Sequence, residues 1–500
     1  MAIRPLELSA DWYAAGQRQK VAWVTRVALL ASLLGAALVV TYETYTPVYL
    51  LCGVLAAAVI WRPRIGLYFA FVWVLLFEEG GADQLMIPGK YFLSGLSATF
   101  PDADSLIFSP LEVLLVVTTL SWLGRAAVAR SWRALDFRPG TLLGPMVAFS
   151  VFVVTGFVHG ATDGGDLNIA FWEVRSLAYL GIVYVLAANL IRTPRHVARL
   201  LALGTGASVI LALEFVYRRL EYVSTNLIGV ARELAYWHES SALLAAMLAL
   251  VVTQVALGGR LLPRLVALAY APFMAVGMLA AERRAGFIAL VVAGLTVALI
   301  LFITHRKAFF LLAVPLMVAG ALYLPLYWNA GGIWSQPARA VKSLVEPDAR
   351  DAASNEYRVR ENMNIRATID SSPLLGVGFG REFHFVVPMP NLSWWPFWRY
   401  EPHNNVMWVW LKTGVFGFIA FWYLMGSAVT RATQAFRFQR EPTLRALALV
   451  SLAALVISLT FSWVDLGLIV ARLTVFLGTL LGALGVIDRL TEAAPQETAA

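Results

Sequence analysis

Charged residues are scarce in this chain: they make up 14% of its 500 residues, where a soluble domain carries about a quarter. Only one cysteine is present, Cys52, which excludes an internal disulfide and a multi-cysteine metal site. Walker, Gly-x-Ser-x-Gly and His-Glu-x-x-His patterns are also missing, which argues against a P-loop nucleotide site and two common classes of hydrolase. The composition therefore excludes an ordinary soluble domain.

Apolar sequence dominates instead. Hydrophobic residues make up 59% of the chain, and apolar runs of about 18–20 residues, the length that crosses a bilayer as a helix, recur along it. We therefore predict an all-α polytopic membrane protein with about 12–14 transmembrane helices. The candidate spans are residues 23–42, 46–61, 65–79, 107–124, 141–158, 173–191, 200–217, 238–258, 265–282, 285–304, 309–327, 403–424, 446–463 and 467–486.

Positive residues indicate how these spans are oriented. Cytoplasmic loops carry an excess of Lys and Arg, and the basic clusters within 4–20, 62–64 and 125–138 fall on one side if the spans alternate. Later clusters, up to 431–445, follow the same alternation. We therefore interpret the net charge of +8 as topology control rather than nucleic-acid binding, and we expect both termini in the cytoplasm.

The spans divide the chain into parts with different expected locations. Arginines on short translocated loops work against the topology signal, so Arg175 and Arg284, on the opposite face, suggest a function beyond topology. The expected parts are a cytoplasmic N-terminal segment (1–22), transmembrane helices 1–11 (23–327), a large periplasmic loop (328–402), C-terminal transmembrane helices (403–486) and a cytoplasmic tail (487–500).

The 328–402 loop is the long polar interruption between the apolar runs. Its residues 357–370 have a helical pattern in which Met363, Ile365 and Ile369 make apolar contacts and the arginines project. The sequence PLLGVGFG follows at 373–380. Its glycines permit positive φ and close backbone approach, which suits either a binding turn or a tight connector.

The sequence Pro402-His403-Asn404-Asn405 stands at the start of the next apolar run. Either asparagine could cap the helix. A histidine at this position is expected to have a pKa lowered by the helix dipole, which keeps the imidazole neutral. Because a neutral imidazole can accept a proton from a hydroxyl, His403 is a candidate general base.

These motifs occur in an order that resembles the O-antigen ligase and Wzy-type polymerase superfamily. An Arg-bearing helix, the PLLGVGFG run and a Pro-His-Asn-Asn-x5-Leu-x2-Gly-x2-Gly pattern at 402–417 carry the resemblance. One departure is Asn364, which stands where the family commonly has an aromatic residue.

Two upstream elements extend the resemblance. ERRAG at 282–286 is similar to the family's Ser-Arg-Gly-type element, with Arg284 at the Arg position and Arg283 where Ser is common. WEVRSLAY at 172–179 resembles an earlier Arg-bearing span, with Arg175 at that position.

The resemblance implies a metal-independent, inverting glycosyltransferase with a GT-C-like membrane fold and no cofactor. Its donor would be a glycan on undecaprenyl diphosphate at the outer leaflet of the bacterial inner membrane. The acceptor would be a hydroxyl of lipid A–core, of another lipid-linked repeat or of another surface molecule. Polysaccharide chain-length or export proteins would be possible partners.

The resemblance also implies roles for individual residues. Arginines would stabilise the diphosphate leaving group, since guanidinium groups bind phosphate bidentately, and His403 would deprotonate the acceptor. The expected catalytic residues are His403, Arg284 and Arg360, and the expected substrate-binding residues are Arg175, Arg283, Arg358, Asn404, Trp395 and His238.

Alternatives stay open at this point. A Wzy-type polymerase would join lipid-linked repeats with the same residues, and the number of spans favours it slightly. A flippase of the same lipid needs a polar path, whereas the apolar runs are mostly free of charge. Trp394, Trp395 and Trp398 could stack on sugar rings or form an interfacial aromatic belt.

Overall fold

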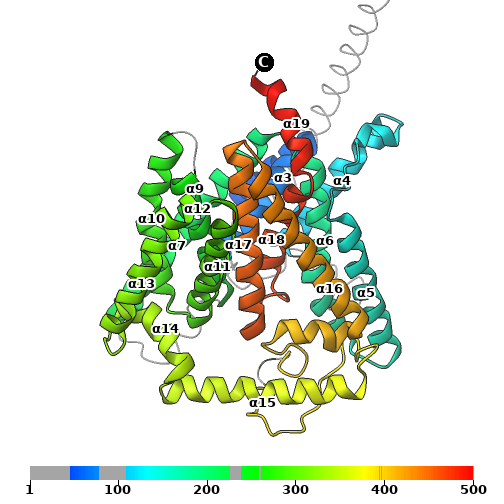
Figure 1. Cartoon of the computed structure of the whole chain (residues 1–500). Coiled ribbons are helices and arrows are strands. Elements are labelled where there is room, and N and C mark those ends of the chain that lie inside the picture. The colour runs from blue at the N-terminus through cyan, green and yellow to red at the C-terminus, as the bar shows by residue number, and fades with distance from the viewer. Residues whose placement is uncertain are drawn as a thin grey trace, which may run out of the picture. The chain divides into compact units, whose positions relative to one another are not determined.

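The computed structural model describes residues 46–77, 109–225, 238–257, 261–393, 395 and 397–498. Every regular element in these residues is a helix (Figure 1). Nine of the described helices are long and apolar enough to cross a membrane, and three shorter apolar helices accompany them. The prediction of an all-α polytopic membrane protein is therefore confirmed, while the predicted span 23–42 lies outside the described residues.

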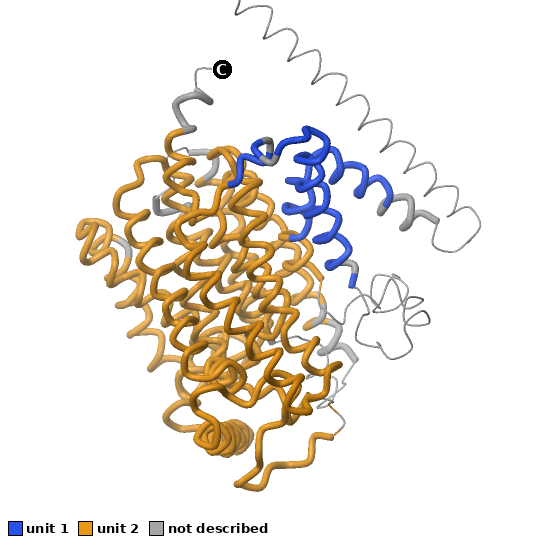
Figure 2. The backbone as a smooth tube through the Cα atoms, turned by 90° about the vertical axis from the view of Figure 1, so that its right-hand side faces the viewer, with its two compact units in different colours: residues 1–70, 80–96, 107–137 blue, residues 71–79, 97–106, 138–500 orange. Residues whose placement is uncertain are grey.

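The described residues belong to two compact units, coloured separately in Figure 2. The break falls within α3, between Ala70 and Phe71. Unit 1 contains α2 (Thr46–Trp61), the first half of α3 (Pro63–Leu76), α4 (Pro110–Val128) and the short helix η3 (Trp132–Leu135).

In unit 1, α4 begins with a capping box. Ser109 Oγ accepts the Glu112 N–H at 3.2 Å, and a Glu112 carboxylate oxygen accepts the Ser109 N–H at 2.6 Å. The Ser-x-x-Glu spacing predicts this arrangement, because each side chain satisfies a backbone N–H that the first helical turn leaves unpaired. Further along α4, Ser121 Oγ donates to the Val59 and Ile60 carbonyls at 3.0 Å, which ties α4 to α2.

Unit 2 contains the rest of the described chain. Each predicted span from 141–158 onwards corresponds to one helix or to consecutive helices of unit 2, although α7 and α16 extend well beyond the predicted limits. They are α5 (Leu143–Thr162), α6 (Leu167–Leu190), α7 (Pro194–Thr225), α9 (His238–Leu257), α10 (Leu261–Ala281), α11 (Arg284–Thr304), α12 (Arg306–Ala308), η4 (Phe309–Ala313), α13 (Val314–Tyr327), η5 (Ile333–Ser335), α14 (Gln336–Val345), α15 (Ala349–Ser371), α16 (Asn405–Phe438), α17 (Pro442–Val464), α18 (Ala471–Gly485) and α19 (Ile487–Thr498).

The core of unit 2 surrounds α17, the most buried of the nine candidate spans. Helices α9, α11 and α16 pack against it. Nearby, α6 and α18 approach closely because glycines of α18 face α6: a Cβ at Gly478 would lie 2.8 Å from the Leu180 carbonyl oxygen, and one at Gly482 would lie 2.4 Å from that of Tyr184. Small residues permit such close packing of apolar helices.

A buried arginine joins three elements of unit 2. Arg472, at the start of α18, is 1% exposed. Its guanidinium donates to the Val74 and Leu75 carbonyls at 2.8 and 3.2 Å and pairs with Glu239 of α9 at 3.2 Å. Because the last carbonyls of a helix have no partner within it, Arg472 satisfies the end of α3 while Glu239 balances its charge.

Between α13 and α16 the chain leaves the bundle and builds η5, α14 and α15. Helix α15 lies across the end of unit 2 where α11 and α16 begin and α17 ends (Figure 1). Residues at these three helix ends contact α15, through the Arg284 and His403 side chains and the Val464 backbone carbonyl. The predicted loop residues are therefore placed directly against the helix ends.

Candidate active site

Helix α15 begins at a capped turn, where Asp348 accepts the Asp351 N–H at 2.8 Å. Ile365 and Ile369, four residues apart, are 0% and 4% exposed and form its buried face. Met363, which the sequence predicts to make apolar contacts as well, is 52% exposed. That expectation is wrong because two residues correspond to about 200° around a helix, so positions 363 and 365 point in nearly opposite directions.

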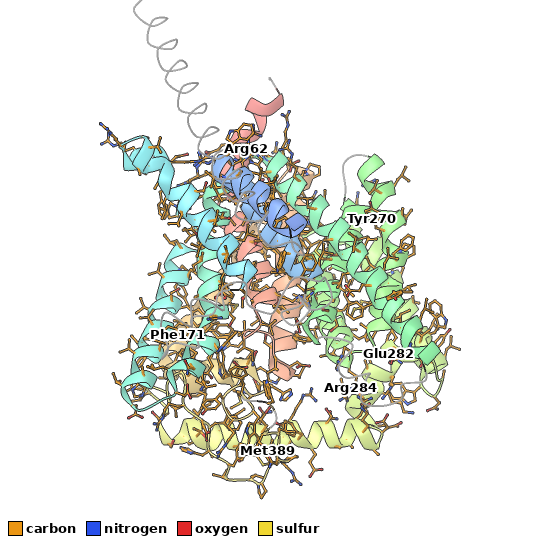
Figure 3. The ribbon with its side chains drawn as sticks, turned by 180° about the vertical axis from the view of Figure 1, so that it is seen from behind. Arg62, Phe171, Tyr270, Glu282, Arg284 and Met389 are labelled. Carbon is orange, nitrogen blue, oxygen red and sulfur yellow. The ribbon has the colours of Figure 1, made fainter. Side chains whose placement is uncertain are left out.

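Asn364 holds the segment that follows α15 against that helix. Its side-chain oxygen accepts the N–H groups of Val386 and Val387 at 2.9 and 2.7 Å, and its amide donates to the Val387 carbonyl at 2.9 Å. The segment bearing Met389 lies on the side of α15 away from the helix bundle (Figure 3). These hydrogen bonds give a physical reason for an amide where an aromatic residue is common.

The glycine-rich run at 373–380 is a close-packed connector. Gly376, Gly378 and Gly380 have φ of 70°, 82° and 77°, which only glycine adopts readily. A Cβ at Gly378 would lie 2.4 Å from the backbone nitrogen of Gly160, at the end of α5. The glycines therefore let this turn press its backbone onto the helices, which accounts for them without a ligand.

A fully buried ion pair locks this turn in place. Glu173 of α6 and Lys412 of α16 are both 0% exposed, with Nζ 2.8 Å from a carboxylate oxygen. Glu173 also accepts the Gly380 N–H at 2.6 Å and the Trp408 indole N–H at 3.3 Å. Lys412 in turn donates to the Arg381 carbonyl at 2.6 Å. Sequence reasoning missed this pair, although a lysine within an apolar run signals a buried partner.

His403 stands just before α16 and is held by Glu361 of α15. The two carboxylate oxygens of Glu361 lie 3.1 Å from His403 Nδ1 and 2.9 Å from the His403 backbone nitrogen. The Tyr357 ring meets the imidazole edge-to-face, with centroids 5.4 Å apart. The His403 side chain is 20% exposed, whereas that of Glu361 is 2% exposed.

The expectation that the His403 pKa is lowered is wrong. Burial alone lowers this pKa, but the hydrogen bond and the negative charge of Glu361, helped by Asp465, raise it above its usual value against the opposing charge of Arg358. The helix dipole argument failed because it considered α16 alone and omitted the carboxylate that α15 brings beside the ring.

A small cavity lies beside His403. Its volume is about 100 Å³, which is room for a few water molecules, each of about 30 Å³, or for the hydroxyl-bearing edge of a sugar. Two of the predicted site residues besides His403 line it, Arg358 and Asn404. The other lining residues are Glu361, Asn362, Trp463 and Val464.

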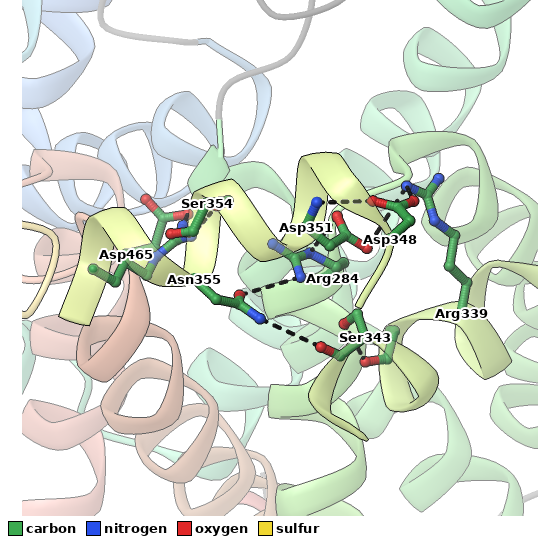
Figure 4. Close-up of polar contacts among 10 residues, drawn as sticks. Arg284, Arg339, Ser343, Asp348, Asp351, Ser354, Asn355 and Asp465 are labelled. Carbon is green, nitrogen blue, oxygen red and sulfur yellow. Dashed lines mark hydrogen bonds and ion pairs between the residues drawn. The ribbon is translucent and has the colours of Figure 1, made fainter. Parts of the chain in front are cut away.

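Arg358 and Arg284 contact adjacent residues of α15. Arg358 donates to the Ser354 side chain, and to the Val464 carbonyl at 2.7 Å. Arg284 donates to Asn355 at 3.4 Å. Figure 4 shows the Arg284 guanidinium against this stretch of the helix, and Figure 3 shows Arg284 between the bundle and α15.

Each of these two arginines also faces a carboxylate. Arg284 Nε lies 3.4 Å from Asp351, and Arg358 lies 3.9 Å from Asp465. Both arginine side chains keep about a quarter of their surface exposed, at 23% and 25%. The structure thus brings Arg358 to His403 and places Arg284 one to two turns of α15 further along.

Arg360 does not line the His403 cavity. It pairs with Glu356 and donates to the Pro388 carbonyl at 3.4 Å, with 43% of its side chain exposed. Positions 358 and 361 are three residues apart and share a face of α15, whereas position 360 points elsewhere. Arg283 is the N-cap residue of α11, directly before Arg284.

Aromatic rings connect two of the predicted substrate-binding residues, Arg175 and Trp395. The Arg175 guanidinium stacks over Trp172 at 4.2 Å. Trp172 meets Phe397 at 6.4 Å, and Phe397 meets Trp395 at 6.3 Å, both edge-to-face. This aromatic row connects α6 to the segment before α16.

The last two predicted residues begin helices. Asn404 caps α16 by accepting the Met407 N–H at 3.1 Å, and its amide donates to Asn362 at 3.1 Å. His238 is the first residue of α9, and its side chain lies outside the described part of the structure.

Two carboxylates of the chain bear on the predicted metal independence. Within the described residues no group of three His, Cys, Asp or Glu side chains is placed to hold a metal ion. However, Asp102 and Asp104 form an Asp-x-Asp sequence between the candidate spans 65–79 and 107–124, and carboxylates in such a pattern suit Mg²⁺. Both residues lie outside the described ranges, so metal independence stays a prediction.

A model of a known protein family matches the part of the chain that contains most of these residues. Residues 269–422 match the family model described as O-antigen ligase (Wzy_C). The match covers Arg284, α15, the glycine-rich turn and His403. The comparison with curated proteins gave no match.

Proposed function

We propose, from the premise that residues 269–422 form an O-antigen ligase domain, that the chain is a glycosyltransferase of the O-antigen ligase-like family. It transfers a glycan from undecaprenyl diphosphate to an acceptor hydroxyl of lipid A–core or another surface molecule. The observation that carries this proposal is the cavity shared by His403 and Arg358. A candidate general base stands there beside a cation that suits a diphosphate.

In the proposed reaction, His403 activates the acceptor. Nε2 of the neutral imidazole takes the proton of the acceptor hydroxyl, whose oxygen attacks the anomeric carbon of the donor. The glycosidic C–O bond breaks as the new bond forms, and its electron pair leaves on the diphosphate oxygen. Because one displacement occurs from the opposite face, the anomeric configuration inverts. The imidazolium then returns its proton to water.

Arg284 and Arg358 stabilise the leaving diphosphate. Their ion pairs with Asp351 and Asp465, at 3.4 and 3.9 Å, are long for charge-assisted contacts, which are about 2.7–2.9 Å. A diphosphate can therefore replace these partners with shorter, bidentate contacts. Removing one preorganised donor of this kind typically costs about 10²–10³ in rate.

The other predicted residues lie around this centre in the proposal. Asn404, which lines the cavity, contacts the acceptor. The aromatic row ending at Trp395 supports sugar rings, because sugars present apolar faces that stack on aromatic side chains. Residues proposed to hold the diphosphate or glycan further from the cavity are Arg175, Arg283, Arg360 and His238.

We place this reaction on the periplasmic side of the bacterial inner membrane, with both termini in the cytoplasm. The distribution of Lys and Arg between the spans supports that orientation. The arginines supply the positive charge, so the proposed reaction uses neither a metal ion nor a cofactor.

The test is a deletion strain complemented with variants and examined by gel analysis of its surface polysaccharide. Wild-type protein and His384→Ala restore the product, whereas His403→Ala leaves full-length glycan on the polyprenyl carrier. His384 is the matched control, because it is exposed in the same segment and uses its backbone N–H, which alanine retains, to bond Thr368.

Other results of the same experiment would contradict the proposed ligase activity. Short single-repeat products in the deletion strain would assign the chain as a polymerase instead. Donor accumulating on the cytoplasmic face would indicate a flippase and remove the enzyme proposal altogether.

A further inference from the structure

Glu361 has an unusual position for a carboxylate in a helix that crosses the end of a bundle. It is almost completely buried, at 1% exposure, and both of its oxygens are used by His403, one by the ring Nδ1 at 3.1 Å and one by the backbone nitrogen at 2.9 Å. The Tyr357 ring packs edge-to-face against the imidazole, with centroids 5.4 Å apart. Glu361 is thus built into the structure around His403.

The chemistry of these two groups determines which nitrogen carries the proton. An ionised carboxylate can only accept hydrogen bonds, so Nδ1 must be the protonated nitrogen of a neutral His403 ring. Nε2 then has the available lone pair, and it makes no hydrogen bond to the described residues. If Glu361 were absent, His403 Nδ1 would lose the acceptor that favours the Nδ1–H tautomer.

We propose that Glu361 is a positioning residue of the transfer reaction, which holds His403 in the Nδ1–H tautomer and stabilises the imidazolium formed when Nε2 takes the acceptor proton. The proposal rests on the proposed glycosyltransferase function. In the step, the O–H bond of the acceptor breaks and an Nε2–H bond forms. The positive charge created on the ring then lies beside the Glu361 carboxylate, and no proton moves to Glu361.

The other charges around His403 define what Glu361 contributes. Helix α15 supplies Tyr357 and Arg358 beside Glu361, and the connection from α17 to α18 supplies Asp465. Arg358 opposes a positive ring, while Asp465 favours it. Because burial also disfavours the charged ring, removing the Glu361 charge leaves Asp465 alone against two opposing effects, and the pKa of His403 falls.

The first measurement is histidine NMR on the full-length protein in detergent. The chain has six histidines, so selective ¹⁵N-histidine labelling gives few signals, and His403→Ala assigns the one of interest. We expect the Nδ1–H tautomer in the wild type. In Glu361→Gln we expect a mixture of tautomers and a ring that loses its proton at lower pH. Asp370→Asn is the control, since it removes an exposed carboxylate from the same helix.

The second measurement is transfer as a function of pH. Membranes of the deletion strain provide the polyprenyl-linked donor and the acceptor, and equal amounts of each folded variant are added. General base catalysis contributes about 10²–10⁴ in rate, so Glu361→Gln is expected to lose at least tenfold, with its acid limb moved to lower pH. Glu361→Asp keeps the charge and is expected to lose less rate, with a limb closer to that of the wild type.

The results separate this proposal from the function on which it rests. If the wild type transfers glycan and Glu361→Gln matches its rate, the positioning role is wrong. It is also wrong if Glu361→Gln loses rate while the tautomer and titration of His403 stay unchanged, because Glu361 would then only support the fold. If the wild type transfers no glycan, the glycosyltransferase proposal fails and the positioning role fails with it.

Discussion

Replacing Lys412 by methionine tests the buried pair that holds the glycine-rich turn. The substitution keeps most of the side-chain volume but removes the ammonium, which lies 2.8 Å from Glu173 with both side chains 0% exposed. The Glu173 carboxylate is then left in the interior of unit 2 without its counter-ion. Its remaining partners are the Gly380 N–H and the Trp408 indole N–H.

The loss in free energy of unfolding follows from the burial of the pair. Removing one member of a buried ion pair costs about 3–5 kcal/mol, because an uncompensated charge stays buried. The two hydrogen bonds that Glu173 retains put Lys412→Met near the lower end, about 3 kcal/mol. Since about 1.4 kcal/mol is a factor of ten, this is roughly a hundredfold in the unfolding equilibrium. Adding Glu173→Gln removes the orphaned charge, so the double variant should be more stable than additivity predicts, by about 1–3 kcal/mol.

The assay is equilibrium unfolding in mixed micelles of dodecyl maltoside and dodecyl sulfate, followed by tryptophan fluorescence. Glu382→Gln is the matched control: it breaks the Arg399–Glu382 pair, which is 2.8 Å long but 38% and 41% exposed, and exposed pairs contribute about 0–1 kcal/mol. If Lys412→Met costs no more than this control, or if its effect is additive with Glu173→Gln, the pair does not lock the turn.

Five further outcomes are expected. Gly378→Ala, at a φ of 82° with no room for a Cβ, should yield little folded protein on size-exclusion chromatography, and a normal yield would contradict the close packing. Arg284→Ala should reduce transfer by about 10²–10³, and Arg366→Ala, an exposed arginine of α15, should not. Because the His403 pKa is raised, transfer should fall as the pH drops through that raised value. The contact between protonated His403 and Glu361 contributes to the stability of the fold. This contribution is fully present below a pH of about 6.5 and is lost as the pH rises above the raised pKa of His403. Chemical unfolding across this pH range tests it. EDTA should leave the transfer rate unchanged, and inhibition by EDTA would instead implicate Asp102.

The spans could be predicted from the sequence because a bilayer imposes its requirement locally, through the length of each apolar run. The predicted helical pattern at 357–370 corresponds to part of α15, because the spacing of apolar residues along a helix is also a local signal. Boundaries were less predictable: α15 starts at Ala349 and α16 continues to Phe438, since polar extensions beyond the membrane carry no hydropathy signal.

The site was only partly predictable because its contacts join distant parts of the chain. The resemblance selected Arg360, but the phase of α15 brings Arg358 and Glu361 to His403. Glu173 and Lys412 meet through helices that are separate in sequence. No local pattern identifies Glu361, since its role depends on α15 crossing the start of α16.

The central claim is that the cavity at His403 performs glycan transfer, and purified protein in liposomes tests it most directly. Polyprenyl-linked donor and acceptor extracted from the deletion strain are added, and released undecaprenyl diphosphate and glycosylated acceptor are measured by mass spectrometry. The account predicts both products in equal amounts with wild-type protein and with His384→Ala, and neither with His403→Ala. Transfer by His403→Ala at the wild-type rate would contradict it.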